Sequence, residues 1–311
     1  MRVFRPAVID EVPRTALHGE IEALPSNQRL VESEALCVYW ARAAQIPHVL
    51  HEIGRLRELT FRAVGEGTGR RSDVDRFDAD YVHMFVWDAR AHAIVGAYRL
   101  GLVDEIITRH GVRGLYTHSL FEYGTELLDC LSPAIELGRS FVRAEYQRSF
   151  APLLLLWCGI GRFIERSPRY AVLFGPVSIS GRYTAASRRL MVDYLAGCMA
   201  DDRVSRQVKP RRPFLYGTPT ARPDATPVPT TIEELSRRVA RIEPNGHGVP
   251  VLLRHYLRLG GRVLEFSIDD EFSNALDALM MLDLRRVEPA LLARYMGDAG
   301  SAAFRAHHAL D

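Results

Sequence analysis

Hydrophobic positions in the first third of the chain follow a helical period and then a strand period. Between residues 46 and 66, apolar side chains that include Val49 and Ile53 recur at helical spacing until glycines interrupt the pattern, which predicts one amphipathic helix. Residues 81–88 and 92–100 are rich in β-branched and aromatic side chains and are separated by a short polar link. We therefore expect an antiparallel hairpin after the helix.

The rest of the chain continues to alternate between the two periods. A strand, a helix, a strand and a helix are predicted at residues 134–142, 152–166, 170–180 and 183–197. Residues 201–230 contain six prolines and little apolar periodicity, which indicates an extended connector. After the connector we expect two helices, a strand and another apolar run, at residues 232–242, 249–260, 261–269 and 275–287.

This order of elements predicts a mixed α/β (α+β) fold in three parts. Residues 1–200 would form the core and residues 201–230 the Pro-rich connector. Residues 231–311 would form a C-terminal α/β extension that packs on the core. The leucine-rich helix starts near Phe150 and meets charged residues after Gly161, so it is too short to cross a bilayer and is expected to be a core helix.

Composition and charge exclude several classes of function. The 311 residues are 47% hydrophobic and 25% charged, which is typical of a globular protein, and the net charge of +2 favours no nucleic-acid partner. No signal-peptide core and no spanning segment is visible, so we expect a cytoplasmic protein. The cysteines are far apart and lack metal-ligand spacing, which predicts reduced thiols and no metal site; they are Cys37, Cys130, Cys158 and Cys198.

A carboxylate and an arginine lie three residues apart in the predicted strand ELGRSFV. Glu136 and Arg139 are flanked by apolar residues, where a charged pair is costly to bury without partners. Strict alternation would place them on opposite faces, but a bulge at Gly138 would bring both to one side. A structural ion pair and a functional site explain this stretch about equally well on the residues alone.

A second charged run, DVDRFDADYVH, covers residues 73–83. Its four aspartates lack the glycine and the bidentate glutamate of an EF-hand loop, so we expect an acidic loop that pairs with arginines. His83 and Asp88 have H-x4-D spacing, but in a strand this offset turns the two side chains to opposite faces. Phosphate-binding glycine loops, serine-hydrolase elbows and zincin motifs are absent from the sequence.

Four motifs together resemble a known family. LRELTF at residues 56–61, DVDRFD at 73–78, VGAYRLG at 95–101 and ELGRSFV at 136–142 are similar to motifs of the acyl-homoserine-lactone synthases. They resemble still more closely the ornithine-lipid and glycine-lipid N-acyltransferases and the related hemolysin-like proteins. The resemblance implies a GNAT-like fold, with a mostly antiparallel central sheet flanked by helices and a C-terminal extension.

The resemblance also assigns roles to residues at the matching positions. Glu136 would be the general base, Arg139 would lie at the bulge whose freed N–H groups hold the thioester carbonyl oxygen, and Tyr183 would protonate the leaving thiolate. A surface or capping role for Tyr183 is an equally open alternative. The residues expected to bind substrates are Arg57, Phe61, Asp75, Asp78, Arg99, Ser140, Phe141, Ser178 and Ser180.

The expected acyl donor is an acyl carrier protein, through its acyl-phosphopantetheine, with no tightly bound cofactor. The segment from Gln147 to Pro152 lacks the glycines with which GNAT enzymes bind the CoA pyrophosphate, so acyl-CoA is the less favoured donor. Arginines and a lysine on nearby segments would dock the carrier or anionic lipid head groups, although solvated surface charge explains each of them singly. They are Arg143, Arg148, Lys209, Arg211 and Arg212.

These observations favour an N-acyltransferase that forms an amide. It would move a long acyl chain, with a 3-hydroxy chain as one option, from acyl carrier protein to the amine of an amino acid, giving a lyso-ornithine or lyso-glycine lipid. A peripheral contact with the inner membrane stays open. The alternatives are O-acylation of a lysolipid and a non-catalytic, hemolysin-like protein that acts on membranes.

Overall fold

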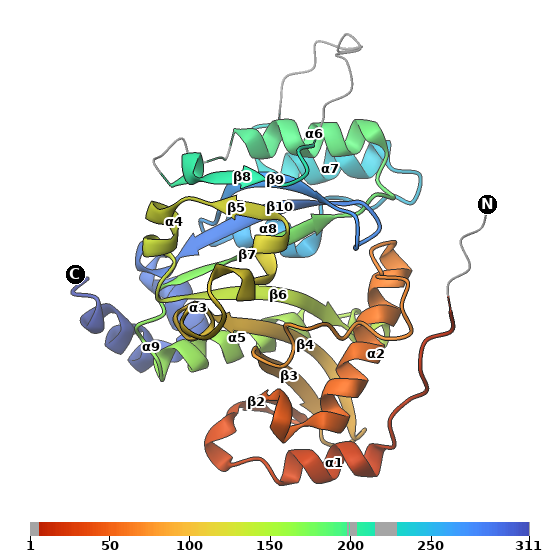
Figure 1. Ribbon diagram of the computed structural model, residues 1–311, viewed down its shortest axis with the longest axis vertical. Helices are drawn as coiled ribbons and strands as arrows, with labels where there is room; N and C mark the ends of the chain where they lie inside the picture. Colours follow the sequence, from red (N-terminus) through yellow and green to blue (C-terminus); the bar gives the residue numbers. More distant parts are fainter. Residues whose placement is uncertain (1–5, 198, 200–203, 215–228, 311) are drawn as a thin grey trace. The chain divides into compact units, whose positions relative to one another are not determined.

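The computed structural model describes residues 6–197, 199, 204–214 and 229–310 (Figure 1). Cys198 and most of the predicted connector, residues 201–203 and 215–228, lie outside the described residues. The chain divides into two compact units with interleaved sequences. Unit 1 takes residues 1–116, 131–173 and 283–311, and unit 2 takes residues 117–130 and 174–282. The predicted boundaries at residues 200 and 230 stay predictions.

In the described part of unit 1, five strands pair in antiparallel order. They follow one another in the sheet in the order β1 (Arg29–Ser33), β2 (Leu36–Arg42), β3 (Val82–Asp88), β4 (Ala93–Leu102) and β6 (Ala134–Val142). The expected hairpin is confirmed, because β3 pairs with β4 from Val82 opposite Leu100 to Asp88 opposite Ala93. The strand predicted at residues 134–142 is β6 itself.

Helices cover both faces of this sheet (Figure 1). On β4, the ring of Tyr98 lies 6.5 Å from that of Trp157 in α5 (Ala151–Glu165), whereas the next residue, Arg99, points away from α5 to Asp75. This alternation places α5 on one face and α2 (Pro47–Val64), which packs on β4 and β6, on the other. The remaining helices of unit 1 are α1 (Arg14–Glu22), α3 (Val103–His110) and α9 (Pro289–His307).

The leucine-rich segment forms a core helix, as predicted. Pro152 lies in the first turn of α5, and Leu156, Trp157 and Ile160 are buried. α9 packs along the same helix. Among the described residues, no helix is both long enough and apolar enough to cross a membrane.

Unit 2 combines short strands with helices from two parts of the sequence. β10 (Ala275–Asp283) lies between β7 (Val172–Ile179) and β9 (Arg262–Asp269). A separate pair is formed by β5 (Phe121–Tyr123) and β8 (Val208–Pro210), so part of the predicted connector is a strand, too short for its period to show in the sequence. The helices are α4 (Thr125–Cys130), α6 (Ala185–Ala196), α7 (Ile232–Ile242) and α8 (Val251–Arg258).

The fold class is therefore the one expected: a mixed α/β protein with a mostly antiparallel sheet flanked by helices. The apolar run at residues 275–287 contains β10, whose residues from Ala275 to Leu282 are all buried. A strand that is buried on both faces shows no alternation, so its type could not be read from the period.

Candidate active site

Three arginines and three aspartates form one buried network in unit 1. α2 supplies Arg57, β4 supplies Arg99 and β6 supplies Arg139, while the carboxylates come from the loop that precedes β3, as Asp73, Asp75 and Asp78. The expectation that this acidic run pairs with arginines is confirmed. Among the described residues no group of His, Cys, Asp and Glu side chains is arranged to hold a metal ion.

Asp78 is shared between two guanidiniums. Its Oδ1 lies 2.8 Å from Arg57 Nη1 and 3.3 Å from Arg99 Nη1. Arg99 Nη1 also donates to Asp75 Oδ1 at 2.6 Å. Burial alone would raise the pKa of Asp78, but the two guanidiniums outweigh it and hold that pKa well below its usual range. Asp78 is therefore a carboxylate at neutral pH and links α2 to β4.

The guanidinium of Arg99 is also surrounded by aromatic rings. Its Cζ lies 5.0 Å from the ring centre of Tyr81, 5.3 Å from Tyr116 and 5.7 Å from Phe77. Within the described part of the chain, Arg99 Nε and Nη2 have no hydrogen-bond partner, so the rings take the place of further acceptors. Although burial opposes it, the neighbouring aspartates raise the pKa of Arg99 above its ordinary value.

A β-bulge brings Glu136 and Arg139 to the same face of the sheet. Arg99 pairs with Gly138 and Ala97 pairs with Phe141, so β6 contains one residue more than β4 across this interval. Arg139 has a φ of 52°, in the left-handed region. The predicted bulge is thus confirmed, but the residue with the unusual backbone is Arg139 and not Gly138. The extra residue turns Arg139 back to the side on which Glu136 lies.

Arg139 closes the network at its more exposed end. Its Nε lies 3.1 Å from Asp73 Oδ2, its Nη2 lies 3.6 Å from Asp75 Oδ2, and its Nη1 donates to the Tyr116 hydroxyl at 3.1 Å. The side chains of Arg139 and Asp75 are 10% and 15% exposed, whereas that of Arg57 is fully buried. Arg139 and Asp75 are therefore the members of the network that are partly exposed to solvent.

Glu136 is held by two tyrosines. Its Oε2 accepts a short hydrogen bond from the Tyr81 hydroxyl and another, at 3.1 Å, from the backbone N–H of Tyr116. Burial and the adjacent Glu136 carboxylate raise the pKa of Tyr81 well above its ordinary value, so Tyr81 is the proton donor of this pair. Glu136 and Arg139 both contact Tyr116, through its backbone N–H and its hydroxyl respectively.

A glycine makes room for this contact. Gly101 of β4 pairs with Glu136 of β6, and a Cβ atom on Gly101 would lie 2.6 Å from Cε1 of the Tyr81 ring. The absence of a side chain at residue 101 therefore lets the Tyr81 ring pack against β4 with its hydroxyl at Glu136. The second glycine of the VGAYRLG motif, Gly101, is thus explained by its packing against Tyr81.

The comparisons with known proteins bear on these same residues. An acetyltransferase (GNAT) domain profile matches residues 56–157, which include every member of the network. The chain is 28% identical to an L-ornithine N(alpha)-acyltransferase of Brucella abortus, over 78% of this chain and 84% of that protein. It is 30% identical to a glycine N(alpha)-acyltransferase of Bacteroides thetaiotaomicron, over 86% of this chain and 82% of that protein. The chain belongs to this family of N(alpha)-acyltransferases.

Two further similarities complete the comparison. A glycine N(alpha)-acyltransferase of Phocaeicola vulgatus is 36% identical to this acyltransferase over a shorter match, 53% of this chain and 54% of that protein. A solved structure titled as a CoA-dependent acyl-homoserine lactone synthase, BjaI, with SAM and isopentyl-CoA shows a distant likeness. Its TM-score is 0.41 at 14% sequence identity, over 86% of this chain and 97% of that chain.

The other residues predicted for the site lie in different places. Phe61 is buried one turn after Arg57 on α2, and Ser140 and Phe141 follow the bulge on β6. Ser178, Ser180 and Tyr183 belong to unit 2. There the Ser178 hydroxyl donates to Asp277 at 2.6 Å, Ser180 Oγ accepts from the Arg182 N–H at 3.2 Å, and the Tyr183 hydroxyl donates to the Gly248 carbonyl at 2.7 Å. The catalytic and binding roles of all these residues stay predictions.

Sequence reasoning missed four members of the site in this acyltransferase: Asp73, Tyr81, His83 and Tyr116. Asp73 belongs to the acidic run of residues 73–83 but was not predicted as a site residue. His83 was not predicted either, because in a strand it and Asp88 would lie on opposite faces. Nε2–H of His83 donates to the Asp78 carbonyl at 2.8 Å, and burial next to Arg57 lowers the pKa of His83 to about 4. No sequence motif identifies Tyr116, which contacts Glu136 through its backbone N–H and Arg139 through its hydroxyl.

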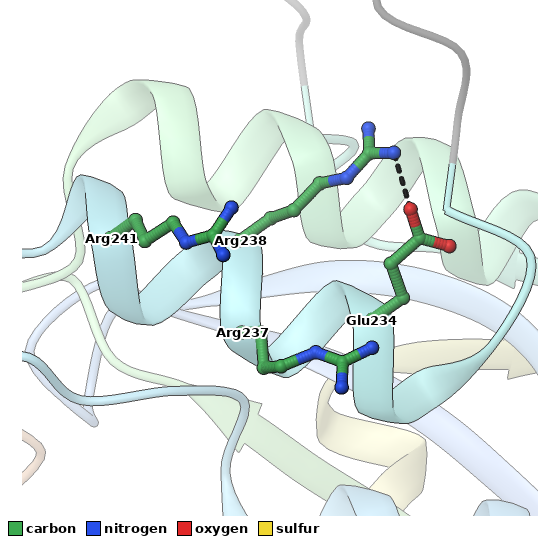
Figure 2. A pocket seen from close by; sticks show the side chains of 4 residues that line it. All are labelled: Glu234, Arg237, Arg238 and Arg241. Atoms are coloured by element: carbon green, nitrogen blue, oxygen red, sulfur yellow. Dashed lines mark hydrogen bonds and ion pairs between the residues drawn. The ribbon is translucent and has the colours of Figure 1, made fainter.

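Most of the basic residues expected to dock a partner are paired locally. Arg143 lies 3.0 Å from Glu145, Arg211 lies 2.9 Å from Glu122, and Arg212 pairs with Asp270. A cleft of about 430 Å³ lies instead on α7, lined by Glu234, Arg237, Arg238 and Arg241 (Figure 2). None of these four residues was predicted as part of the site.

Proposed function

We propose that the protein transfers a long acyl chain from acyl carrier protein to the amine of an amino acid such as glycine or ornithine, which gives a lyso-aminolipid. The observation that carries this proposal is the 30% identity over 82% of a glycine N(alpha)-acyltransferase. The network of Glu136, Arg139 and their partners, which lies wholly inside the GNAT match, supports it.

The reaction is the aminolysis of a thioester. The neutral amine attacks the thioester carbonyl carbon, a C–N bond forms and the C–S bond breaks, and the products are an amide and the free thiol of the carrier. The amine must lose a proton and the leaving thiolate must gain one. The developing oxyanion needs N–H donors in place before the reaction begins. In our proposal, backbone N–H groups at the Arg139 bulge supply those donors.

Glu136 is the proposed general base for the acceptor ammonium, directly or through a water. Its Oε2 is held by the Tyr81 hydroxyl and the Tyr116 N–H, which fixes the carboxylate in one orientation. A fixed base reduces the entropy lost on reaching the transition state. In this scheme the tyrosines orient the carboxylate that takes the proton.

The acceptor is proposed to bind at the exposed end of the network. Arg139 and Asp75 are the partly exposed members there, and they carry opposite charges. A guanidinium suits the carboxylate of an amino acid, and a carboxylate suits its ammonium group. An amino acid bound against the exposed side of these two groups would have its amine on the same face of the sheet as Glu136.

The donor is proposed to be acyl carrier protein, not free CoA. α5 starts at Ala151 with Pro152 in its first turn, after a segment without glycine, so this helix start has fewer close N–H groups for a pyrophosphate. The proposed donor of a proton to the leaving thiolate is Tyr183. Its hydroxyl now donates to Gly248, so this role requires that it exchange that hydrogen bond for one to sulfur.

The test is an acyl-transfer assay with the purified chain, acyl carrier protein loaded with a long acyl chain, and a panel of amines, read by mass spectrometry. An acyl-amide of glycine, ornithine or another amino acid is expected, and no amide with any amine would overturn the proposed function. Parallel reactions with acyl-CoA as donor, and with a lysolipid as acceptor, separate the CoA-dependent and O-acylating alternatives. Tyr183→Phe in the same assay tests the proton donor.

The variant that tests the general base is Glu136→Gln. It keeps the shape and removes the charge, so turnover should fall by about a hundredfold or more. The control is Glu145→Gln, an exposed glutamate shortly after β6 that pairs only with Arg143 among the described residues. Full activity in Glu136→Gln, with the native fold confirmed by circular dichroism, would remove Glu136 from the role of base.

A further inference from the structure

Unit 2 carries an arginine surface on two neighbouring helices. We define it by Arg237, Arg238 and Arg241 of α7 and by Arg254 and Arg258 of α8. Figure 2 shows the three α7 arginines following one another along the helix, with Arg238 reaching toward Glu234. Together with Glu234 they line the cleft of about 430 Å³. Arg258 pairs with Glu233 in the first turn of α7, at 3.0 Å, which places the α8 arginines beside α7.

The pattern of α7 is strongly amphipathic. Ile232, Leu235 and Val239 are buried on one side. Arg237 and Arg241 are four residues apart on the opposite side and are exposed. The arginines are therefore a solvent-facing row on a well-anchored helix. A rigid row of guanidiniums presents its charges at fixed positions.

The charge of this surface is not balanced. Two carboxylates, Glu233 and Glu234, pair with Arg258 and Arg238. Within the described residues Arg237, Arg241 and Arg254 form no ion pair, and Nε of the half-buried Arg254 has no hydrogen-bond partner. This differs from Arg143, Arg211 and Arg212, each of which has a carboxylate partner. Three positive charges are left for an anionic ligand.

Aliphatic side chains stand beside the unbalanced arginines. Ile242, next to Arg241, is 41% exposed, and Val251 is 49% exposed. On α8, Val251, Arg254 and Arg258 are spaced so that they share one face of the helix. Val251 therefore shares the α8 face of Arg254 and Arg258, and Ile242 is the exposed last residue of α7.

We propose that the arginine surface binds an anionic phospholipid membrane, with the guanidiniums on phosphate head groups and with Ile242 and Val251 entering the interface. Guanidinium forks match phosphate oxygens, and a row of cations beside exposed aliphatic residues is the combination that holds a helix at a charged bilayer surface. An acidic protein would satisfy the charges but would give the aliphatic side chains no acyl region to enter. The lipid surface therefore fits both features.

The experiment measures vesicle binding by the full chain with no acyl donor or acceptor present, so its outcome is independent of the proposed activity. Vesicles of phosphatidylcholine alone are compared with vesicles that also contain phosphatidylglycerol, by co-sedimentation. Arg237→Glu/Arg241→Glu reverses two charges that have no partner among the described residues. It should weaken binding to the anionic vesicles by about tenfold or more. The matched control is Arg90→Glu/Arg286→Glu, which makes the same charge change on two exposed arginines of unit 1.

Salt and a second variant separate the two parts of the surface. The effect of Arg237→Glu/Arg241→Glu should shrink as salt rises, because exposed charges are screened. Ile242→Ser/Val251→Ser should weaken binding at every salt concentration. Failure of the wild-type chain to bind anionic vesicles would overturn the proposal. So would an equal loss in the control, or binding at this surface to purified acyl carrier protein but not to vesicles.

Discussion

At the scale of single residues, the site separates into charges that hold the fold and charges that face solvent. Arg57, Arg99 and Asp78 are almost fully buried, and both guanidiniums pair with the Asp78 carboxylate. Removal of one partner from such a buried set leaves an uncompensated charge, which typically costs about 3–5 kcal/mol. These residues therefore position the loop of residues 73–78 against α2 and β4. In our proposal, contact with a substrate falls to the partly exposed Arg139 and Asp75 and to the buried Glu136.

Tyr81 provides the sharpest test of how Glu136 is held. Tyr81→Phe keeps the ring that packs against Gly101 and Arg99 and removes only the hydroxyl that donates to the carboxylate. A hydrogen bond to a charged group contributes about 1.5–3 kcal/mol, so kcat in the acyl-transfer assay should fall by about ten- to hundredfold. The KM for the amine should change less, because the acceptor contacts proposed for Arg139 and Asp75 remain.

The control for this variant is Tyr146→Phe. It removes a similar tyrosine–carboxylate hydrogen bond, from Tyr146 to Asp88 at 2.9 Å, outside the network. Thermal unfolding should stay cooperative in both variants, since neither changes the packing of a ring. The lost buried hydrogen bond should lower the Tm of Tyr81→Phe by several degrees. A wild-type kcat in Tyr81→Phe would show that the orientation of Glu136 does not depend on Tyr81.

At the scale of elements, the long regular segments were predictable and the pairing between them was not. The helix α2 and the strands β3, β4 and β6 have clear periods, and the bulge on β6 was expected because two charges stood three residues apart around Gly138. The sequence could not tell which aspartate of the loop meets which arginine, since that depends on tertiary packing. It also gave no sign that Arg139, and not the glycine, takes the left-handed backbone.

Other elements left weak signals. β5 and β8 have three residues each, too few to show alternation. α9 is interrupted at Gly297, whose φ of 75° breaks the helical geometry and with it the apolar period. Buried and half-buried positions do not alternate strictly along β2, so the period of apolar residues does not identify it as a strand. In these elements the pattern of apolar positions was too short or too irregular to identify the element.

The packing between β4 and Tyr81 gives a prediction at this scale. Gly101→Ala would place a methyl group 2.6 Å from the Tyr81 ring, so the ring must move or the strand must shift. Overpacking of this kind costs about 1–3 kcal/mol in the free energy of unfolding, measured by urea titration. Gly138→Ala is the matched control in the neighbouring strand, because its added Cβ would meet no atom within 4 Å among those described. Equal effects in the two variants would contradict the packing role of Gly101.

At the scale of the whole molecule, both units are assembled from interleaved segments. Unit 1 joins residues 1–116, 131–173 and 283–311, which are separated in the sequence by segments of unit 2. The limits of the unit therefore cannot be recognised from the order of elements along the chain. The network nevertheless draws all its residues from the central part of unit 1, between Arg57 and Arg139. The motifs of this part were therefore visible in the sequence even though the limits of the units were not.

The buried network makes the stability of the whole chain depend on pH, through His83. Burial next to Arg57 lowers the pKa of His83 to about 4 in the folded chain, against about 6.5 when it is unfolded. Between these values the unfolded chain binds a proton that the folded chain does not, so the free energy of unfolding falls as the pH decreases through this window. The loss should total about 3 kcal/mol and should level off below about pH 4, where only the carboxylates continue to titrate.

His83→Asn is the variant that isolates this contribution. An amide can still donate to the Asp78 carbonyl but binds no proton, so the variant should lose most of the decrease between about pH 6.5 and pH 4 that the wild type shows. Urea unfolding followed by circular dichroism at a series of pH values measures the difference between the two proteins at each pH. His51→Asn, on an exposed position of α2, reports the effect of losing an imidazole elsewhere on the surface. A constant difference between the wild type and His83→Asn across this range would mean that His83 takes up its proton equally in the folded and unfolded chains, and that the charge of Arg57 is not felt at the imidazole.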